Sequence, residues 1–307
     1  MERNTLIMAG NVRIDIDSTK YRTPTQEDLN DAKNFILQRE EFAVTLGQKV
    51  DEILADAAER IVIICYAHNV KPKELIFSSA FNEELMQEIG EVMDETEAEI
   101  LSLIYEYSTR VTNNRERMSV LALWMASLGK GESNLRETLD NYMYKTMKDW
   151  EAAIAAMKYL GVSREDAISK IRMYLHHIYD MPEVLTAIRR RGEFAATYIR
   201  FGGVQKGAVG ISNNGSTNVV NMARMTLQLT WMKDQMLEFK ENGAVGYWQG
   251  RGSSFDCAIC DDEVGFHTDI EDINNKPFPH FNCCCWRMPI YEKGMQDEDI
   301  EFVTSAE

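Results

Sequence analysis

FDCAICDDEVGFHTDIEDINNKPFPHFNCCCWRMP, residues 255–289, holds five of the six cysteines of a 307-residue chain. Thiolate and imidazole are the ligands that zinc prefers, and four of them in a tetrahedron form a closed structural site. The CxxC pair can reach one ion from a single turn, and the later HxxCxC run can supply the remaining ligands. The segment therefore predicts a structural zinc ion bound by four of five residues: Cys257, Cys260, His280, Cys283 and Cys285.

The spacing leaves some alternatives open. Cys284 is left out of the predicted set, because side chains alternate along a strand and it would point away from its neighbours. The choice between Cys283 and Cys285 stays open, and a disulfide bond between the two halves is the alternative to a metal. A catalytic zinc keeps a position for water, whereas enough soft ligands are present here to fill every position. His267 is expected to be a solvated loop histidine.

Composition and charge limit the classes of protein. The chain is 45% hydrophobic and 27% charged, which is typical of a soluble globular protein. It has no run of 18 apolar residues, and its start lacks the small-residue cleavage site of a secretory signal, so we expect a reducing compartment in which thiols bind metal. The net charge is −16, and residues 251–307 hold 13 acidic and 4 basic residues. This balance disfavours a dedicated DNA-binding protein.

The pattern along the chain predicts a mainly α protein: a multi-helix N-terminal body followed by a small α+β zinc-stabilised C-terminal module. Five segments are expected: an N-terminal arm at 1–24, a helical body at 25–200, a Gly/Asn-rich linker at 201–216, a helix with the cysteine module at 217–293, and an acidic tail at 294–307.

Capping signals support the helical assignment. Thr25 with Asp28 three residues later predicts a helix start, and the apolar pattern continues from there to about residue 69. Gly161 predicts the end of another helix, and Ser163 the start of the next. A long helix is expected at 217–241, with its several methionines packed against neighbours. The CCCWRMPIY run is expected to be a strand.

The C-terminal residues resemble the phage Mu F-like minor head protein family, which acts in phage head morphogenesis. In that family a tryptophan is followed by a polar stretch, a CxxC and a glycine, and after a loop by a Pro-His-Pro-Asn-Cys-Arg-Cys run and a strand. The matching positions here are Trp248, Cys257, Cys260, Gly265, Pro279, His280, Asn282, Cys283 and Cys285, preceded by a helix with Ala223, Arg224 and Thr226. Phe281 and Cys284 depart from the pattern, and the resemblance covers residues 217–293.

The resemblance implies a non-enzymatic minor capsid protein that associates with the portal, the capsid and the scaffold, with weak contact with DNA. It implies a location in the capsid interior of the virion, and in the host cytoplasm during assembly. No membrane or small-molecule substrate is expected.

The alternative is a zinc-dependent nucleic-acid-binding protein or nuclease of a phage or mobile element. A nuclease would need an open metal site and a histidine paired with an acid. His176 and His177 lie near Asp180, but adjacent residues on a helix do not share a face, so both are expected to be structural.

Overall fold

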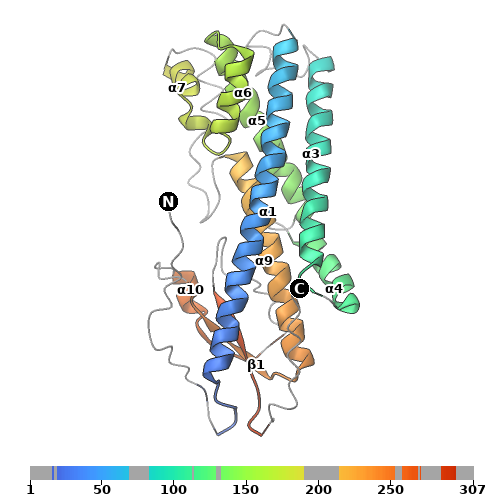
Figure 1. Ribbon diagram of the computed structural model, residues 1–307, viewed down its shortest axis with the longest axis vertical. Coiled ribbons are helices and arrows are strands. Elements are labelled where there is room, and N and C mark those ends of the chain that lie inside the picture. Colours follow the sequence, from blue (N-terminus) through green and yellow to red (C-terminus); the bar gives the residue numbers. More distant parts are fainter. Residues whose placement is uncertain are drawn as a thin grey trace. The chain divides into compact units, whose positions relative to one another are not determined.

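The computed structural model describes residues 16, 19–68, 83–112, 114–128, 133–189, 214–252, 258–268, 270 and 285–294. Within these ranges the protein is mainly helical, with a small antiparallel sheet near its C-terminal end, as the sequence predicted (Figure 1). The helices are α1 (Gln26–Ala67), α3 (Glu83–Thr109), α4 (Arg115–Ser127), α5 (Leu135–Tyr159), α6 (Arg164–Met173), the 3₁₀ helix η1 (Ile178–Asp180), α7 (Pro182–Arg189), α9 (Gly215–Glu241) and α10 (Ala258–Asp262). The strands are β1 (Gly246–Gly250), β2 (Gly265–His267) and β3 (Trp286–Ile290).

The chain forms two compact units, each assembled from separate segments. The first contains Met1–Val44, Tyr107–Met125 and Met225–Glu307, and the second contains Thr45–Glu106 and Ala126–Arg224. No helix in the described ranges is long and apolar enough to cross a membrane.

The predicted helix ends are confirmed. At the start of α1 the Asp28 N–H donates to Thr25 Oγ1 (3.2 Å), and the Thr25 N–H donates to the Asp28 carboxylate (2.6 Å), which together satisfy two backbone donors. Past the end of α5, Gly161 has a φ of 73°, a left-handed conformation that glycine adopts without steric cost. Ser163 then caps α6 by accepting the Asp166 N–H.

Helix α9 is buried on most of its surface. Met222, Met232 and Met236 are all at least 97% buried, which confirms that these methionines pack in the interior. Thr230 satisfies its buried hydroxyl by donating to the Thr226 carbonyl one turn earlier (2.8 Å). The helix begins at Gly215, so the last residues of the linker predicted at 201–216 are already helical, while residues 201–213 lie outside the described ranges.

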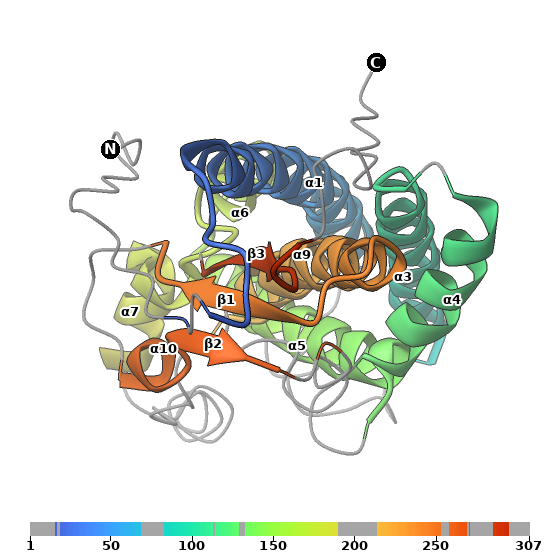
Figure 2. The ribbon, with the colours of Figure 1, turned by 90° about the horizontal axis from the view of Figure 1, so that it is seen from below.

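The sheet of the first unit has the order β2-β1-β3, with antiparallel pairing throughout (Figure 2). Side chains alternate across it, so the two faces bury different residues. One face packs against α1 and contains Trp248, Trp286, Met288 and Ile290 beside Ala32 and Ile36. On the other face Tyr247 packs with residues of α9: Met232, Met236 and Phe239. The short sheet is therefore stabilised by helices on both faces.

In the first unit α4 contacts α9 through Arg117, whose guanidinium lies 3.4 Å from Asp234, 3.8 Å from Glu238 and 3.9 Å from Glu241. Burial raises the pKa of Asp234 to about 6; Arg117 and a hydrogen bond from Thr112 oppose the rise, and the two glutamates add to it. One half-buried arginine thus faces three acids, and the charged form of Asp234 is disfavoured.

Two glycines in helices of the second unit, Gly215 and Gly90, allow a matched test of packing. A Cβ at Gly215 would lie 2.4 Å from the backbone nitrogen of Thr146, whereas a Cβ at Gly90 would meet nothing within 4 Å. We expect Gly215→Ala to lower the free energy of unfolding by about 1–3 kcal/mol through overpacking. Gly90→Ala should raise it by roughly 0.5–1 kcal/mol, because alanine loses less backbone entropy in a helix. Urea denaturation followed by circular dichroism measures both, and equal effects of the two substitutions would contradict the close approach.

Asp234 predicts a pH dependence of stability. Its pKa in the folded protein lies above the unfolded value of 3.8, so its stabilising contribution is present below pH 3.8 and is lost as the pH rises through about 6. We expect Asp234→Asn to unfold at the same urea concentration as the parent protein at pH 4 and to be more stable by about 1–3 kcal/mol at pH 7.5. Asp94→Asn, which changes an exposed carboxylate on α3, is the control. A parent protein that gains stability relative to Asp234→Asn between pH 4 and 7.5 would refute this account.

Candidate metal centre

Of the first half of the predicted zinc site, the structure describes Cys260, which lies on α10. This five-residue helix contains Cys260, which is 5% exposed. The Arg251 guanidinium pairs with the Asp261 carboxylate at 2.5 Å and so ties the helix to the end of β1. After the helix, His267 Nε2 donates to the Glu263 carbonyl (2.9 Å), which fixes the entry to β2. The turn with Cys260 is therefore held at both ends.

The second half begins at Cys285, which is 4% exposed and directly precedes β3. The next residue, Trp286, pairs with Gly250 of β1, and its indole N–H donates to the Arg251 carbonyl (2.9 Å). A Cβ at Gly250 would lie only 2.2 Å from the Trp286 ring, so glycine is needed for this close packing.

Arg251 is the residue that joins these two halves. Its backbone carbonyl binds the β3 side through Trp286, and its side chain binds α10 through Asp261. Two buried thiols that are 25 positions apart in the sequence thus belong to segments attached at the same end of β1. The sequence alone did not single out Arg251, because its role depends on the pairing of β1 with β3.

The described residues fit the chemistry of a zinc site but include only part of it. Cys260 and Cys285 are buried thiols, the donor type that zinc prefers, and neither is in a disulfide bond. Cys257, His280 and Cys283 lie outside the described residues, as does Cys284. Among the described residues alone, no group of three or more His, Cys, Asp or Glu side chains could hold a metal. The four-ligand set therefore stays a prediction.

The expectation for His267 was wrong, because the residue belongs to β2 and is half-buried. Its ring stacks on Tyr247 with centroids 4.9 Å apart and planes 9° apart, and the two residues are register partners in the sheet. On the same tyrosine ring the Arg287 guanidinium lies 4.7 Å from the centroid. The imidazole therefore packs within the sheet and uses one nitrogen for the Glu263 carbonyl.

His176 of the second unit pairs with a carboxylate that sequence reasoning did not identify. Its Nε2 lies 2.7 Å from Asp51 Oδ1, and its Nδ1 lies 3.2 Å from Thr217 Oγ1. A carboxylate only accepts, so Nε2 donates to Asp51. His177 is 73% exposed and lies 3.9 Å from Asp180. The arrangement joins three chain segments and occupies both His176 nitrogens, and the structural role expected for this histidine stays a prediction.

A buried carboxylate fixes the start of α9 in the same unit. Asp149 accepts hydrogen bonds from Lys145 Nζ (2.8 Å), the Gly215 N–H (2.8 Å) and the Tyr179 hydroxyl. Burial raises the pKa of Asp149, while Lys145, Tyr179 and Gly215 oppose the rise. Because protein donors already surround this carboxylate, it offers no open position for a ligand.

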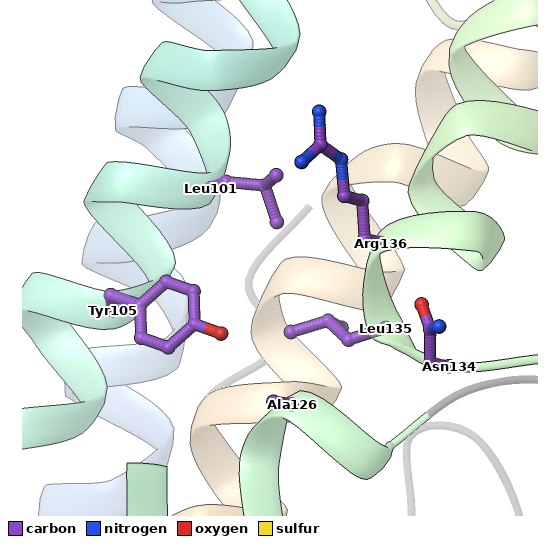
Figure 3. Close-up of a pocket in the computed structure, with 6 residues that line it drawn as sticks. All are labelled: Leu101, Tyr105, Ala126, Asn134, Leu135 and Arg136. Atoms are coloured by element: carbon purple, nitrogen blue, oxygen red, sulfur yellow. The ribbon is translucent and has the colours of Figure 1, made fainter. Parts of the chain in front are cut away.

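The second unit also contains an open pocket with a volume of about 320 Å³. Leu101 and Tyr105 reach into it from α3, Leu135 and Arg136 from the start of α5, and Ala126 from the end of α4 (Figure 3). Its lining is mainly apolar, with Arg136 and Asn134 as the polar residues.

Comparison with known proteins does not extend these observations. The chain matches no protein-family model, no curated protein and no solved structure.

Substitution of different cysteines should have different effects on the amount of bound zinc. We expect about one zinc ion per chain in the parent protein and in Cys65→Ser, and almost none in Cys260→Ser. Cys65 is the matched control because burial, with Glu151 nearby, raises the pKa of its thiol to about 12, so it stays protonated. Elemental analysis of protein purified without chelator gives the metal content.

Comparing Cys283→Ser with Cys285→Ser identifies the ligand that the spacing leaves open. A parent protein without zinc, or a Cys260→Ser variant that retains it, would rule out the predicted site.

Proposed function

We propose that this protein is a non-enzymatic minor head protein of a phage, which acts in capsid assembly through contacts with the portal, the capsid and the scaffold. The observation on which this rests is the order of features from α9 onward: a long helix, a strand with a buried tryptophan, a short helix with the buried Cys260, and a strand entered through a buried cysteine. The same order defines the family that residues 217–293 resemble. The proposal is supported by Trp248, Cys260 and Cys285, which are all buried in the first unit.

In this function zinc would act as a clamp. Cys257 and Cys260 would bind it from one side of the module and two of His280, Cys283 and Cys285 from the other, so that the ion closes the loop between them. The ion would add to the contacts that β2, which lies within this loop, makes with β1 in the sheet. Zinc would supply stability to the module and no reaction step.

The charge of the chain agrees with a place inside a capsid. A net charge of −16 gives the protein little attraction for the phosphates of packaged DNA. We therefore propose a location in the capsid interior of the virion, and in the host cytoplasm during assembly, with at most weak contact with DNA.

The proposal is tested by measuring whether the chain is incorporated into phage heads. The chain is co-expressed with the portal, capsid and scaffold proteins of the same genome, and procapsids are purified on a density gradient and analysed by mass spectrometry. We expect the parent chain and Cys65→Ser in the procapsid fraction at a few copies per portal, and at least about tenfold less of Cys260→Ser, because loss of a ligand unfolds the module.

The alternative of a zinc-dependent nuclease or nucleic-acid-binding protein predicts a different outcome. The purified chain would then cut or retain plasmid DNA with zinc, magnesium or manganese, and would lose that activity in Cys260→Ser. A chain absent from procapsids but active on DNA would replace the assembly proposal with this alternative.

A further inference from the structure

The outward face of α3 is strongly acidic. The helix contains nine acidic residues and no lysine, arginine or histidine. Its apolar face is buried within the second unit and includes Leu85, Ile89, Ile100 and Ile104, which are all at most 1% exposed. The opposite face is therefore directed away from this core.

Residues on the outward face recur at alternate spacings of three and four. The stripe consists of Glu84, Gln87, Glu91, Asp94, Ala98, Leu101 and Tyr105, all of them exposed except the half-buried Leu101. This is the heptad spacing by which one helix presents a seam to another. From the first to the last residue the stripe extends over roughly 32 Å at 1.5 Å per residue. Its first four positions are polar or acidic, and its last three are apolar.

The pocket described above lies at the apolar end of the stripe. Leu101 and Tyr105 belong to both, and in Figure 3 their side chains point toward Leu135 and Arg136 of α5. The volume of about 320 Å³ is at the lower end of the range for small ligand sites and is large enough for an apolar side chain.

Carboxyl groups beside the pocket offset the charge of Arg136. Its guanidinium is 77% exposed and lies 3.9 Å from the Glu97 carboxylate. Glu97 in turn shares a hydrogen bond with Asp140, and burial together with Asp140 raises the pKa of Glu97 to about 7. Two carboxyl groups thus accompany the one cation, and the acidic half of the stripe begins two turns away at Asp94.

We propose that the outward stripe of α3 and its pocket bind an amphipathic helix of a partner protein, with an apolar side chain in the pocket and lysines or arginines along Glu84, Glu91 and Asp94. The heptad spacing fits a helix, the apolar pocket fits an anchoring side chain, and the acidic first half of the stripe fits a basic partner. The proposal does not depend on the proposed function, because the surface belongs to the second unit and involves none of the cysteines predicted to bind zinc.

The probe is a fluorescein-labelled helical peptide of 22 residues with leucine at the heptad positions of one half and lysine at those of the other. A second peptide with glutamate in place of lysine is the charge control. Fluorescence anisotropy with the full-length protein measures the dissociation constant. We expect the lysine peptide to bind and the glutamate peptide not to, with affinity falling as salt is raised.

Two variants separate the pocket from the charge. Ala126→Trp fills the pocket from an exposed position without removing a buried side chain, and the double variant Glu91→Lys with Asp94→Lys reverses the acidic stripe. Each should weaken binding by at least about tenfold. The matched control is Glu52→Lys with Glu99→Lys, which changes the net charge equally at exposed positions off the stripe and should alter affinity by less than about threefold.

The binding measurements can either support or overturn the proposed helix-binding surface. Loss of affinity in both variants and not in the control, with unchanged circular dichroism, supports the surface. No binding of the lysine peptide at 100 µM would overturn the proposal, and so would equal affinity of the parent protein and Ala126→Trp. Zinc content and incorporation into procapsids are measured independently, so failure here leaves the proposed function untouched.

Discussion

Burial of α9 on most sides is the constraint on which the other elements depend. In the second unit its first turn lies so close to α5 that Gly215 has no room for a side chain, and Asp149 accepts the hydrogen bond of that turn. In the first unit Trp231 packs edge-on against Phe35 and Phe42 of α1, with ring centroids 5.6 and 5.2 Å away. Burying such a helix requires partners for its polar groups, and Gln228 finds one in the Glu40 carboxylate at 2.6 Å.

The helices were predictable because their signals are local. Apolar residues three and four apart, with capping residues at Thr25 and Ser163, depend only on neighbours within one turn. β1 carried no such signal. Its sequence GYWQG has glycine at both ends, and glycine is depleted in strands. The reason for Gly250 is the Trp286 ring, 36 positions later, so pattern within the strand could not reveal it.

The candidate site also combines features that depend on neighbouring residues, which could be predicted, with contacts between residues far apart in the sequence, which could not. The CxxC and HxxCxC spacings indicated which thiols to consider, since a tight turn constrains ligands that are close in sequence. The supporting contacts are long-range: Arg251 connects to Asp261 and Trp286, and His176 pairs with Asp51 across 125 positions. His267 was misassigned because its surroundings are rich in polar residues, although stacking on Tyr247 places it in a strand.

The packing of Trp286 on Gly250 has a spectroscopic consequence. One Cα hydrogen of Gly250 occupies the direction in which a Cβ would lie 2.2 Å from the indole, so it points at the aromatic ring. The ring current must shift the resonance of that hydrogen away from the usual glycine position. Because the pairing of β1 with β3 creates this geometry, the glycine signal reports whether the strands of the cysteine module are joined, without any label on the metal ligands.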